Sequence, residues 1–277
     1  HGVKLLLLHG GPGSTHDYLE AFDAFLPAAG IEYYYYDQLG AGKSDSPDEA
    51  SLWDLGRFVD ELEQVREALG LDARNLCLYG HSWGGILAIE YALAHQDRLK
   101  ALVVSNMMAS IASYNAYAER VLAPQIESGV LAEVRRLEAE GRTEEPRYME
   151  LLIPHFYERH ILRMPEADWP EPVKRAFALE NRRIYVPMQG PSELGASGAL
   201  LGWDRFDELA RIEVPALVIG AEHDTMESEH LRSMASRLPR GRYHHCPEGS
   251  HLAMWDDQET YFRGLLGFIG DVEAGRI

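Results

Sequence analysis

Hydrophobic residues along this chain alternate between short, almost continuous runs and stretches in which they recur every three or four positions. The short runs contain at most one charged residue each, have the length of buried strands, and lie at residues 3–8, 31–36, 76–79 and 99–104. The stretches between them have the spacing of amphipathic helices, and they lie at residues 18–28, 51–69 and 86–93. Strands that alternate with helices in this way predict an α/β fold with a mostly parallel, doubly wound sheet.

The pattern changes in the middle of the chain. Between about residues 109 and 202 there is no clear buried strand, and helical spacing occurs at residues 114–129, 130–140 and 172–181. The first pattern then returns, with strands expected at residues 214–220 and 243–246 and helices at residues 204–210, 229–238 and 258–269. We therefore expect one core built from residues 1–108 and 203–277, with a helical cap inserted at residues 109–202.

One turn joins a strand to a helix through the sequence G-H-S-W-G-G at residues 80–85. A G-x-S-x-G turn in this context is a nucleophile elbow, which exposes the serine side chain above the sheet at the start of the helix. Glycine is needed at Gly80 and Gly84 because a Cβ atom there would collide where the strand and the helix pass closely. The sequence therefore predicts Ser82 as a nucleophile.

A second glycine-rich loop, H-G-G-P-G-S at residues 9–14, follows the first predicted strand. Acyl transfer needs two N–H groups directed at the tetrahedral oxygen, one after the nucleophile and one from a loop after an earlier strand. Trp83 and Gly11 occupy those two positions and form the predicted oxyanion hole. We expect His9 to brace the loop rather than to transfer protons.

An aspartate and a histidine after the last two strands complete the candidate site. Asp224 lies in the loop after residues 214–220, and His251 lies in the loop after residues 243–246. The C-terminal ends of parallel strands share one edge of the sheet, so we expect Asp224 and His251 to converge on Ser82. Their order along the chain, Ser, Asp, His, is that of α/β-hydrolases. His251 would accept the proton of Ser82, and Asp224 would orient the imidazole.

Other titratable residues near these positions are weaker candidates. Strand alternation and loop position make four neighbours less suitable as the acid or the base, namely Glu222, His223, His244 and His245. Asp37 also follows a strand. An aspartate that opens a glycine-rich loop, however, commonly accepts hydrogen bonds from backbone N–H groups.

The composition limits the partners of the protein. Its 277 residues, 46% of them hydrophobic, can bury a full core, and its net charge of −18 argues against nucleic acid or an anionic membrane surface as a partner. No apolar run approaches the ~18 residues of a membrane span. Cys77 and Cys246 are expected as buried thiols. Residue 1 directly precedes an interior strand, so we expect that an N-terminal segment has been trimmed. We favour a cytoplasmic location, and a periplasmic or secreted one stays open. The sequence leaves the oligomeric state undetermined.

Several of these motifs together resemble the proline iminopeptidase family of α/β-hydrolase serine peptidases. The resemblance lies in H-G-G-P-G at residues 9–13, Y-D-Q-L-G-A-G-K-S at residues 36–44 and G-H-S-W-G-G at residues 80–85. The later segments that agree with it are residues 190–194, 202–204, 220–224 and 249–251. It covers nearly the whole chain and lacks only the family's first strands. It implies a serine exopeptidase that removes an N-terminal residue, typically proline, from short peptides with a free N-terminus.

The resemblance also implies a carboxylate that binds the amino group of the substrate. Glu193 matches the family's amine-binding glutamate, but Thr225 directly follows Asp224 where some members carry a second glutamate. Glu180 of the cap is a candidate for that second carboxylate. A Ser-His-Asp mechanism needs no metal or organic cofactor. An amino-acid amidase or small-ester hydrolase is the alternative enzyme, and a non-catalytic binding protein of this fold would need a broken triad.

Overall fold

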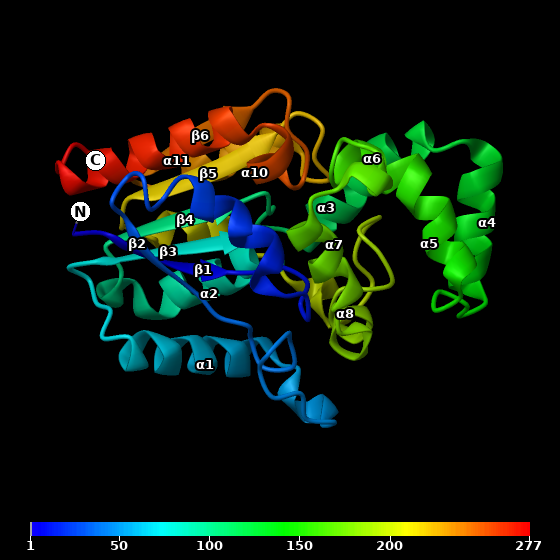
Figure 1. Cartoon of the computed structure of the whole chain (residues 1–277), viewed down its shortest axis with the longest axis horizontal. Helices are drawn as coiled ribbons and strands as arrows, with labels where there is room; N and C mark the ends of the chain where they lie inside the picture. Colours follow the sequence, from blue (N-terminus) through cyan, green and yellow to red (C-terminus); the bar gives the residue numbers. More distant parts are fainter. Residues whose placement is uncertain (1) are drawn as a thin grey trace.

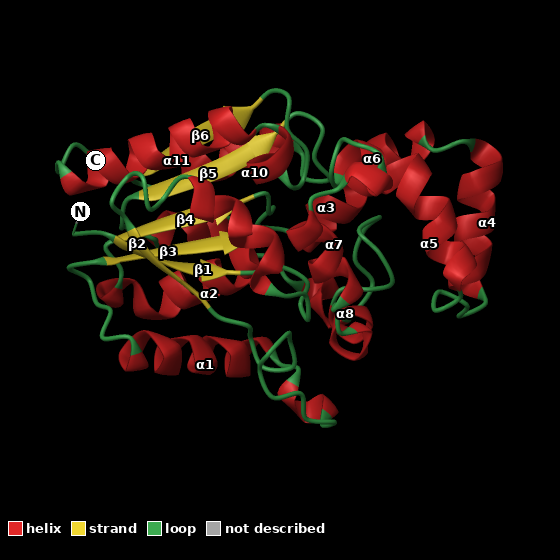
Figure 2. Cartoon of the chain, in the orientation of Figure 1, coloured by secondary structure: helices red, strands yellow, loops and turns green. Residues whose placement is uncertain are grey.

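The computed structural model describes residues 2–277 and contains a six-stranded sheet (Figure 1, Figure 2). Neighbouring strands are parallel throughout, in the order β2-β1-β3-β4-β5-β6. Along the chain the strands are β1 (Lys4–Leu8), β2 (Glu32–Tyr35), β3 (Leu76–His81), β4 (Ala101–Ser105), β5 (Ala216–Ala221) and β6 (Gly241–Cys246). Every predicted strand is present, and the predicted α/β class is confirmed.

Alternate strand residues point to opposite faces of the sheet, and both faces are buried. Leu5 and Leu7 of β1 belong to one hydrophobic core, with η1 and α11, whereas Leu6 and Leu8 belong to the other, with α1, α2 and α9. These elements are the 3-10 helix η1 (His16–Ala24) and the helices α1 (Leu55–Ala68), α2 (Trp83–His95), α9 (Ser228–Arg237) and α11 (Gln258–Glu273). Figure 1 shows α11 on one side of the sheet and α1 and α2 on the other. This two-sided burial explains the almost continuous apolar runs of the sequence.

Several predicted helix boundaries are corrected by the structure. The helix predicted at residues 18–28 is the shorter 3-10 helix η1, and the helix predicted at residues 204–210 is a 3-10 helix at Asp207–Arg211. Helix α1 begins at Leu55 rather than at residue 51. The Asp54 side chain accepts a hydrogen bond from the Arg57 N–H group and so caps the helix at that point.

Residues 109–202, which we call the cap, contain helices and no strand within the described part of the chain. The cap helices lie beyond one end of the strands, on the opposite side of the molecule from the two termini (Figure 1). They are α3 (Ile111–Tyr117), α4 (Ser128–Ala139), α5 (Pro146–Leu152), α6 (Glu158–His160), α7 (Glu171–Ala178) and α8 (Arg182–Met188). The C-terminal ends of the strands face the cap. No helix within residues 2–277 has the length and apolar character needed to cross a membrane.

The single helix predicted at residues 114–129 is wrong. Helix α3 ends at Tyr117, and the chain continues through a π-helical turn and a 3-10 turn, Ala118–Leu122 and Ala123–Gln125. Pro124 has no N–H group to donate within an α-helix, and Ile126, two residues later, is extended, with ψ of 137°. Helix α4 therefore begins afresh after this break.

Candidate active site

Ser82 lies at the corner between β3 and α2. Its backbone has φ of 54° and ψ of −127°, which a side chain adopts only under the constraint of a tight turn. A Cβ atom on Gly80 would lie 2.0 Å from the Gly84 carbonyl oxygen, and one on Gly84 would lie 2.3 Å from the Leu8 carbonyl oxygen. Close backbone contacts therefore require both glycines, as the sequence predicts.

The loops after β5 and β6 bring Asp224 and His251 together beside this corner. Oδ1 of Asp224 lies 2.8 Å from Nδ1 of His251, both side chains are buried, and His251 lines the same pocket as Ser82. Burial lowers the pKa of His251, but Asp224, together with Glu193 and Asp256, raises it by more, so its net pKa lies above the ordinary 6.5. The Asp224 carboxylate thus favours the tautomer whose Nε2 can accept a proton.

Asn106, which is not among the predicted site residues, holds the other oxygen of Asp224. It directly follows β4, and its backbone has φ of 53°. Its Nδ2 donates to Asp224 Oδ2 at 2.8 Å and to the Ser250 carbonyl at 3.3 Å. Asn106 therefore links the ends of three strands. A polar residue directly after a central strand is the sequence signal that could have identified it.

The two predicted oxyanion donors are available. The N–H groups of Gly11 and Trp83 have no hydrogen-bond acceptor within residues 2–277, and Trp83 is the first residue of α2, where N–H groups lack helical partners. His9 Nδ1 donates to the Gly10 carbonyl at 2.9 Å, and its Nε2 accepts from the Gln38 N–H at 3.0 Å. Burial lowers the pKa of His9 to about 4, so the ring stays neutral and braces the loop, as expected.

A chain of hydrogen bonds links the oxyanion loop to the backbone of His251. The Gly10 N–H donates to the Tyr18 hydroxyl at 2.7 Å, and this hydroxyl donates to Nδ1 of His81 at 2.9 Å. Nε2 of His81 donates to the His251 carbonyl at 2.8 Å. Burial holds the pKa of His81 well below its usual range, which keeps this pattern of donors fixed. The sequence carries no signal for the part that Tyr18 has here.

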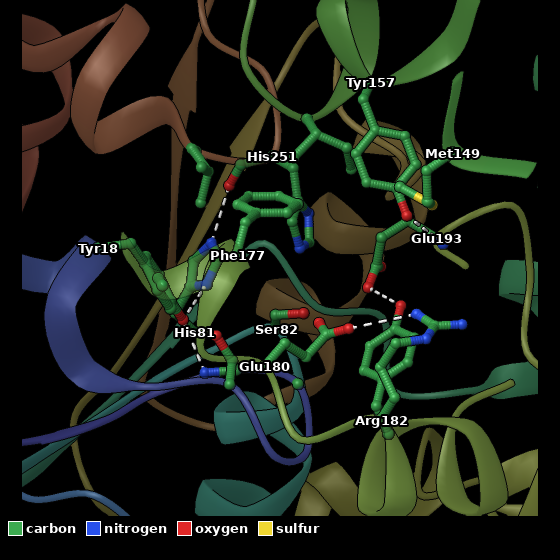
Figure 3. A pocket seen from close by; sticks show the side chains of 17 residues that line it. Tyr18, His81, Ser82, Met149, Tyr157, Phe177, Glu180, Arg182, Glu193 and His251 are labelled. Carbon is green, nitrogen blue, oxygen red and sulfur yellow. Dashed lines mark hydrogen bonds and ion pairs between the residues drawn. The ribbon is translucent and has the colours of Figure 1, made fainter. Parts of the chain in front are cut away.

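Core and cap together line a pocket above Ser82, with about 630 Å³ of space that is partly open to solvent (Figure 3). Its core residues include the oxyanion loop, Ser82 and His251, and the cap supplies the opposite wall. The cap residues that line it are Met149, Tyr157, Ile161, Ala176, Phe177, Glu180, Arg182, Tyr185 and Glu193. A pocket between these two walls suits a small ligand rather than a folded chain.

Glu193 lies on the cap side of this pocket and is held by three tyrosines. Its carboxylate accepts a hydrogen bond from the Tyr185 hydroxyl, its N–H donates to the Tyr157 hydroxyl at 3.1 Å, and its carbonyl accepts from the Tyr114 hydroxyl at 2.6 Å. Burial raises the pKa of Glu193, while the His251 charge and the Tyr185 hydrogen bond oppose the rise. The carboxylate is thus fixed in place, and no cationic side chain of residues 2–277 forms an ion pair with it.

Glu180 brings a second carboxylate to the same pocket. Burial, followed by the charge of Glu193, raises the pKa of Glu180 to about 7. Arg182 donates to Glu180 at 3.5 Å, but its guanidinium is shared with Glu144, which lies 3.1 Å away. The pocket therefore contains more negative than positive charge near Glu193, and a cationic ligand would be stabilised there.

The remaining candidates lie outside the pocket. Thr225 contacts the acid itself, with its hydroxyl 3.3 Å from Asp224 Oδ1, and does not line the pocket. Asp37 accepts from the backbone N–H groups of His16 and Lys43, which is the capping role expected for it. None of the four alternative acids and bases lines the pocket either, namely Glu222, His223, His244 and His245.

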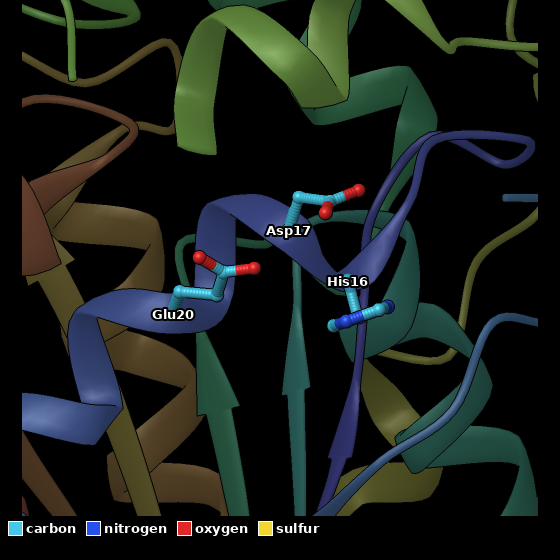
Figure 4. Close-up of side chains that lie close together, drawn as sticks. All are labelled: His16, Asp17 and Glu20. Carbon is cyan, nitrogen blue, oxygen red and sulfur yellow. The ribbon is translucent and has the colours of Figure 1, made fainter. Parts of the chain in front are cut away.

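One group of side chains could in principle hold a metal ion, within the part of the chain that the structure describes. It consists of His16, Asp17 and Glu20, shown in Figure 4. Asp17 and Glu20 are already paired with Arg175 of α7, at 2.6 Å and 2.5 Å, and His16 Nδ1 lies 2.8 Å from Asp37. These charges therefore bind the cap to η1, and none of the three side chains lines the pocket.

A parallel sheet with a strained serine at a strand-to-helix corner, facing an Asp-His pair at the same sheet edge, defines an α/β hydrolase. The family model for the alpha/beta hydrolase fold accordingly matches residues 4–258. The fold expected from the sequence is therefore confirmed.

Curated relatives and solved structures narrow the class. Proline iminopeptidases from Flavobacterium johnsoniae and Chitinophaga pinensis are 50% and 49% identical to this chain, over 99% and 98% of it and over 92% and 90% of the relatives. The crystal structure of proline iminopeptidase from Mycobacterium smegmatis has a TM-score of 0.87 and 29% identity, and covers 100% of this chain and 92% of that one. The crystal structure of VinJ has a TM-score of 0.90 and 30% identity, with coverage of 98% and 90%. The chain belongs to the proline iminopeptidase family.

Proposed function

We propose that this protein is a serine aminopeptidase that releases an N-terminal residue, preferably proline, from short peptides. The observation that carries the proposal is a pair of carboxylates, Glu193 and Glu180, in the same pocket as Ser82 and His251. The names of the relatives that are about half identical to the chain support the preference for proline. A hydrolase of simple esters would have no need for carboxylates beside its nucleophile.

The acylation step uses the corner and the strand-end loops. His251 Nε2 takes the proton from Ser82 Oγ as this oxygen attacks the carbonyl carbon, and Asp224 stabilises the resulting imidazolium. The N–H groups of Gly11 and Trp83 bind the oxygen that becomes negatively charged. His251 then gives its proton to the leaving nitrogen, the peptide bond breaks, and the N-terminal residue remains as an ester on Ser82.

Deacylation repeats these roles with water. His251 takes a proton from the water molecule as its oxygen attacks the ester carbonyl, and the same two N–H groups bind the oxyanion. The proton then returns to Ser82 Oγ, and the free amino acid leaves. The negative charge of the pocket carboxylates acts in both steps. It holds the amino group of the substrate in place while the carbonyl carbon is attacked first by Ser82 and then by water.

Glu193 is the proposed ligand of the substrate's amino group, and Glu180 is the proposed second carboxylate. Glu193 suits this role because tyrosines fix both its backbone and its carboxylate. Glu180 suits the role of second carboxylate because its pKa is raised, which means that the surrounding residues stabilise its ionised form poorly. A charge-assisted hydrogen bond from an ammonium or iminium group would offset the cost of burying that charge.

The test compares free-amine substrates with blocked and uncharged ones on wild type and on Glu193→Gln. The substrates are prolyl, alanyl and N-acetylprolyl amides and phenyl acetate. The substitution should lower kcat/KM for the two free-amine substrates by about 10-fold or more, because one charged hydrogen bond is lost, and should spare the ester. The control is Glu150→Gln, at an exposed residue of the cap. It should change kcat/KM neither for the free-amine substrates nor for the ester.

Each outcome decides between functions. Equal losses on the amide and the ester would show that Glu193 has only a structural role. Efficient turnover of the N-acetylprolyl amide by the wild type would instead replace the aminopeptidase with a general amidase or esterase.

A further inference from the structure

A second, larger pocket of about 1250 Å³ lies in the cap beside the first one. All of its lining residues come from the cap, namely Met149, Ile153, Glu166, Ala167, Trp169, Lys174, Phe177, Ala178, Glu180 and Arg182. We call it the outer pocket, and the one above Ser82 the inner pocket. Apart from Glu180, which lines both pockets, no residue of the outer pocket has a part in the proposed chemistry.

The two pockets share one wall. Met149, Phe177, Glu180 and Arg182 line both of them, and these four side chains are labelled in Figure 3. The Phe177 ring contacts Tyr157 of the inner pocket and Trp169 of the outer pocket, with ring centroids 6.1 Å and 5.1 Å apart. Another cap cavity, formed with residues 191–192 and 194–197, shares no lining residue with the inner pocket within residues 2–277. The outer pocket therefore adjoins the catalytic one across these four side chains.

The outer pocket has an apolar wall and a charged rim. Ile153 and Trp169 supply apolar surface in addition to the shared Met149 and Phe177. At the rim, the exposed Lys174 donates from Nζ to the Ala167 carbonyl at 2.6 Å, and no carboxylate of residues 2–277 forms an ion pair with it. Glu166 is an exposed carboxylate of the same rim. Arg182, in contrast, is already paired with Glu180 and Glu144.

We propose that the outer pocket binds the part of the peptide that follows the scissile bond, with an apolar side chain against Ile153 and Trp169 and the terminal carboxylate near Lys174. The inference rests on the proposed function, since it assumes that the N-terminal residue occupies the inner pocket. The rest of the substrate must then continue out of that pocket, and the adjoining cavity offers it apolar surface and an unpaired cation. The protein would thus select short peptides with an apolar second residue.

The experiment varies only the leaving part of the substrate. Pro-Leu-Gly, Pro-Gly-Gly and the amide of Pro-Leu-Gly are compared by kcat/KM, together with the corresponding dipeptides. Leucine should be preferred over glycine by about 10-fold, as expected for burial of most of its side chain, and Ile153→Ala should reduce this ratio. The free carboxylate should be preferred over the amide by about threefold, as for an exposed ion pair.

Two variants of the rim should move the carboxylate preference in opposite directions. Lys174→Met should bring the ratio of free acid to amide close to one, whereas Glu166→Gln should raise it, because Glu166 repels a carboxylate. Lys100→Met is the control, because Lys100 directly precedes β4 and so lies at the opposite edge of the sheet. Thermal unfolding of each variant verifies that the fold is retained.

The results separate this inference from the proposed function. Failure of the wild type to hydrolyse any prolyl peptide or amide would overturn the proposed function. Hydrolysis with equal kcat/KM for all leaving parts, or with ratios unchanged in Lys174→Met and Ile153→Ala, would retain the proposed function and overturn the role of the outer pocket.

Discussion

The core and the cap contribute to the same pocket but position their residues by different means. In the core, Ser82 is fixed by its backbone, because glycines at Gly80 and Gly84 allow strand and helix to pass within contact distance. In the cap, Glu193 is fixed by side chains, because the hydroxyl groups of Tyr114 and Tyr157 bind its backbone. A backbone constraint can be recognised in the sequence, because it requires glycine at fixed positions near Ser82. The contacts of Glu193 join residues far apart in the chain, and no local sequence motif indicates them.

The two sides also differ in electrostatics. On the core side, the Asp224 carboxylate has several donors, from His251 and Asn106, and its charge is well compensated. On the cap side, Glu180 and Glu193 both have raised pKa values because they are buried with little positive charge nearby. The core side is thus complete before substrate binds, and the cap side is completed by the cation that the substrate supplies.

The largest effect is expected from a substitution on the core side of the pocket, at the nucleophile. Ser82→Ala should lower kcat by about 10⁴-fold or more on every substrate, since the substitution removes the nucleophile. The loss is measured by steady-state kinetics on prolyl amide and phenyl acetate. A fluorophosphonate probe should label the wild type and leave the variant unlabelled.

The control for Ser82→Ala is its thermal unfolding curve, which should match that of the wild type because only a hydroxyl group is removed. Turnover that persists in well-folded, pure variant protein would show that another residue is the nucleophile. Equal losses on amide and ester are expected here, in contrast to the selective loss expected for Glu193→Gln.

The fold and the core side of the site were predictable because strand ends in a parallel sheet share an edge. The positions of Asp224 and His251 follow from that rule and from the order of the elements alone. The position of Asn106 at a strand end follows from the same rule, but no sequence motif marks this residue as part of the site. The Tyr18 hydroxyl, which joins the oxyanion loop to His81, could not be predicted, because its position depends on the packing of η1 against the sheet. The break at Pro124 shows that helical spacing alone does not define the ends of a helix.

A smaller effect is expected on the cap side, in the pH dependence of KM. The pKa of Glu180 is about 7, so its carboxylate is mostly protonated at pH 5.5 and mostly ionised at pH 7.5 and above. Binding of a cationic amine favours the ionised form, so KM for prolyl amide should fall as the pH rises across this range. In Glu180→Gln, this fall should be lost, and KM at pH 7.5 should be several-fold higher than in the wild type.

His251 also has a raised pKa, and its effect on the pH dependence must be separated from that of Glu180. Its raised pKa makes turnover increase with pH on all substrates, because only the neutral imidazole can act as the base. The ratio of kcat/KM for prolyl amide to that for phenyl acetate cancels this common increase. A ratio that is independent of pH in the wild type would remove Glu180 from the amine site.

The smallest effect concerns the contact between the two regions. Arg175 of α7 reaches across from the cap to Asp17 and Glu20 of η1, at 2.6 Å and 2.5 Å, and also pairs with Glu171 on its own helix. The Arg175 side chain is 33% exposed, so solvent screens these ion pairs and reduces their contribution. Arg175→Met should therefore lower Tm only slightly, by less than about 4 °C.

The measurement is thermal unfolding at low and at high salt. Screening weakens exposed ion pairs, so the difference between wild type and Arg175→Met should shrink in 0.5 M NaCl, where the Debye length falls to about 4 Å. Arg183→Met is the matched control, because Arg183 is an exposed cap arginine whose partner Asp48 is 92% exposed, and it should change Tm by less. A loss in Arg175→Met that exceeds this range and is insensitive to salt would mean that the arginine stem packs between α7 and η1 as apolar surface. The contact between cap and core would then depend on burial in the same way as the two cores of the sheet.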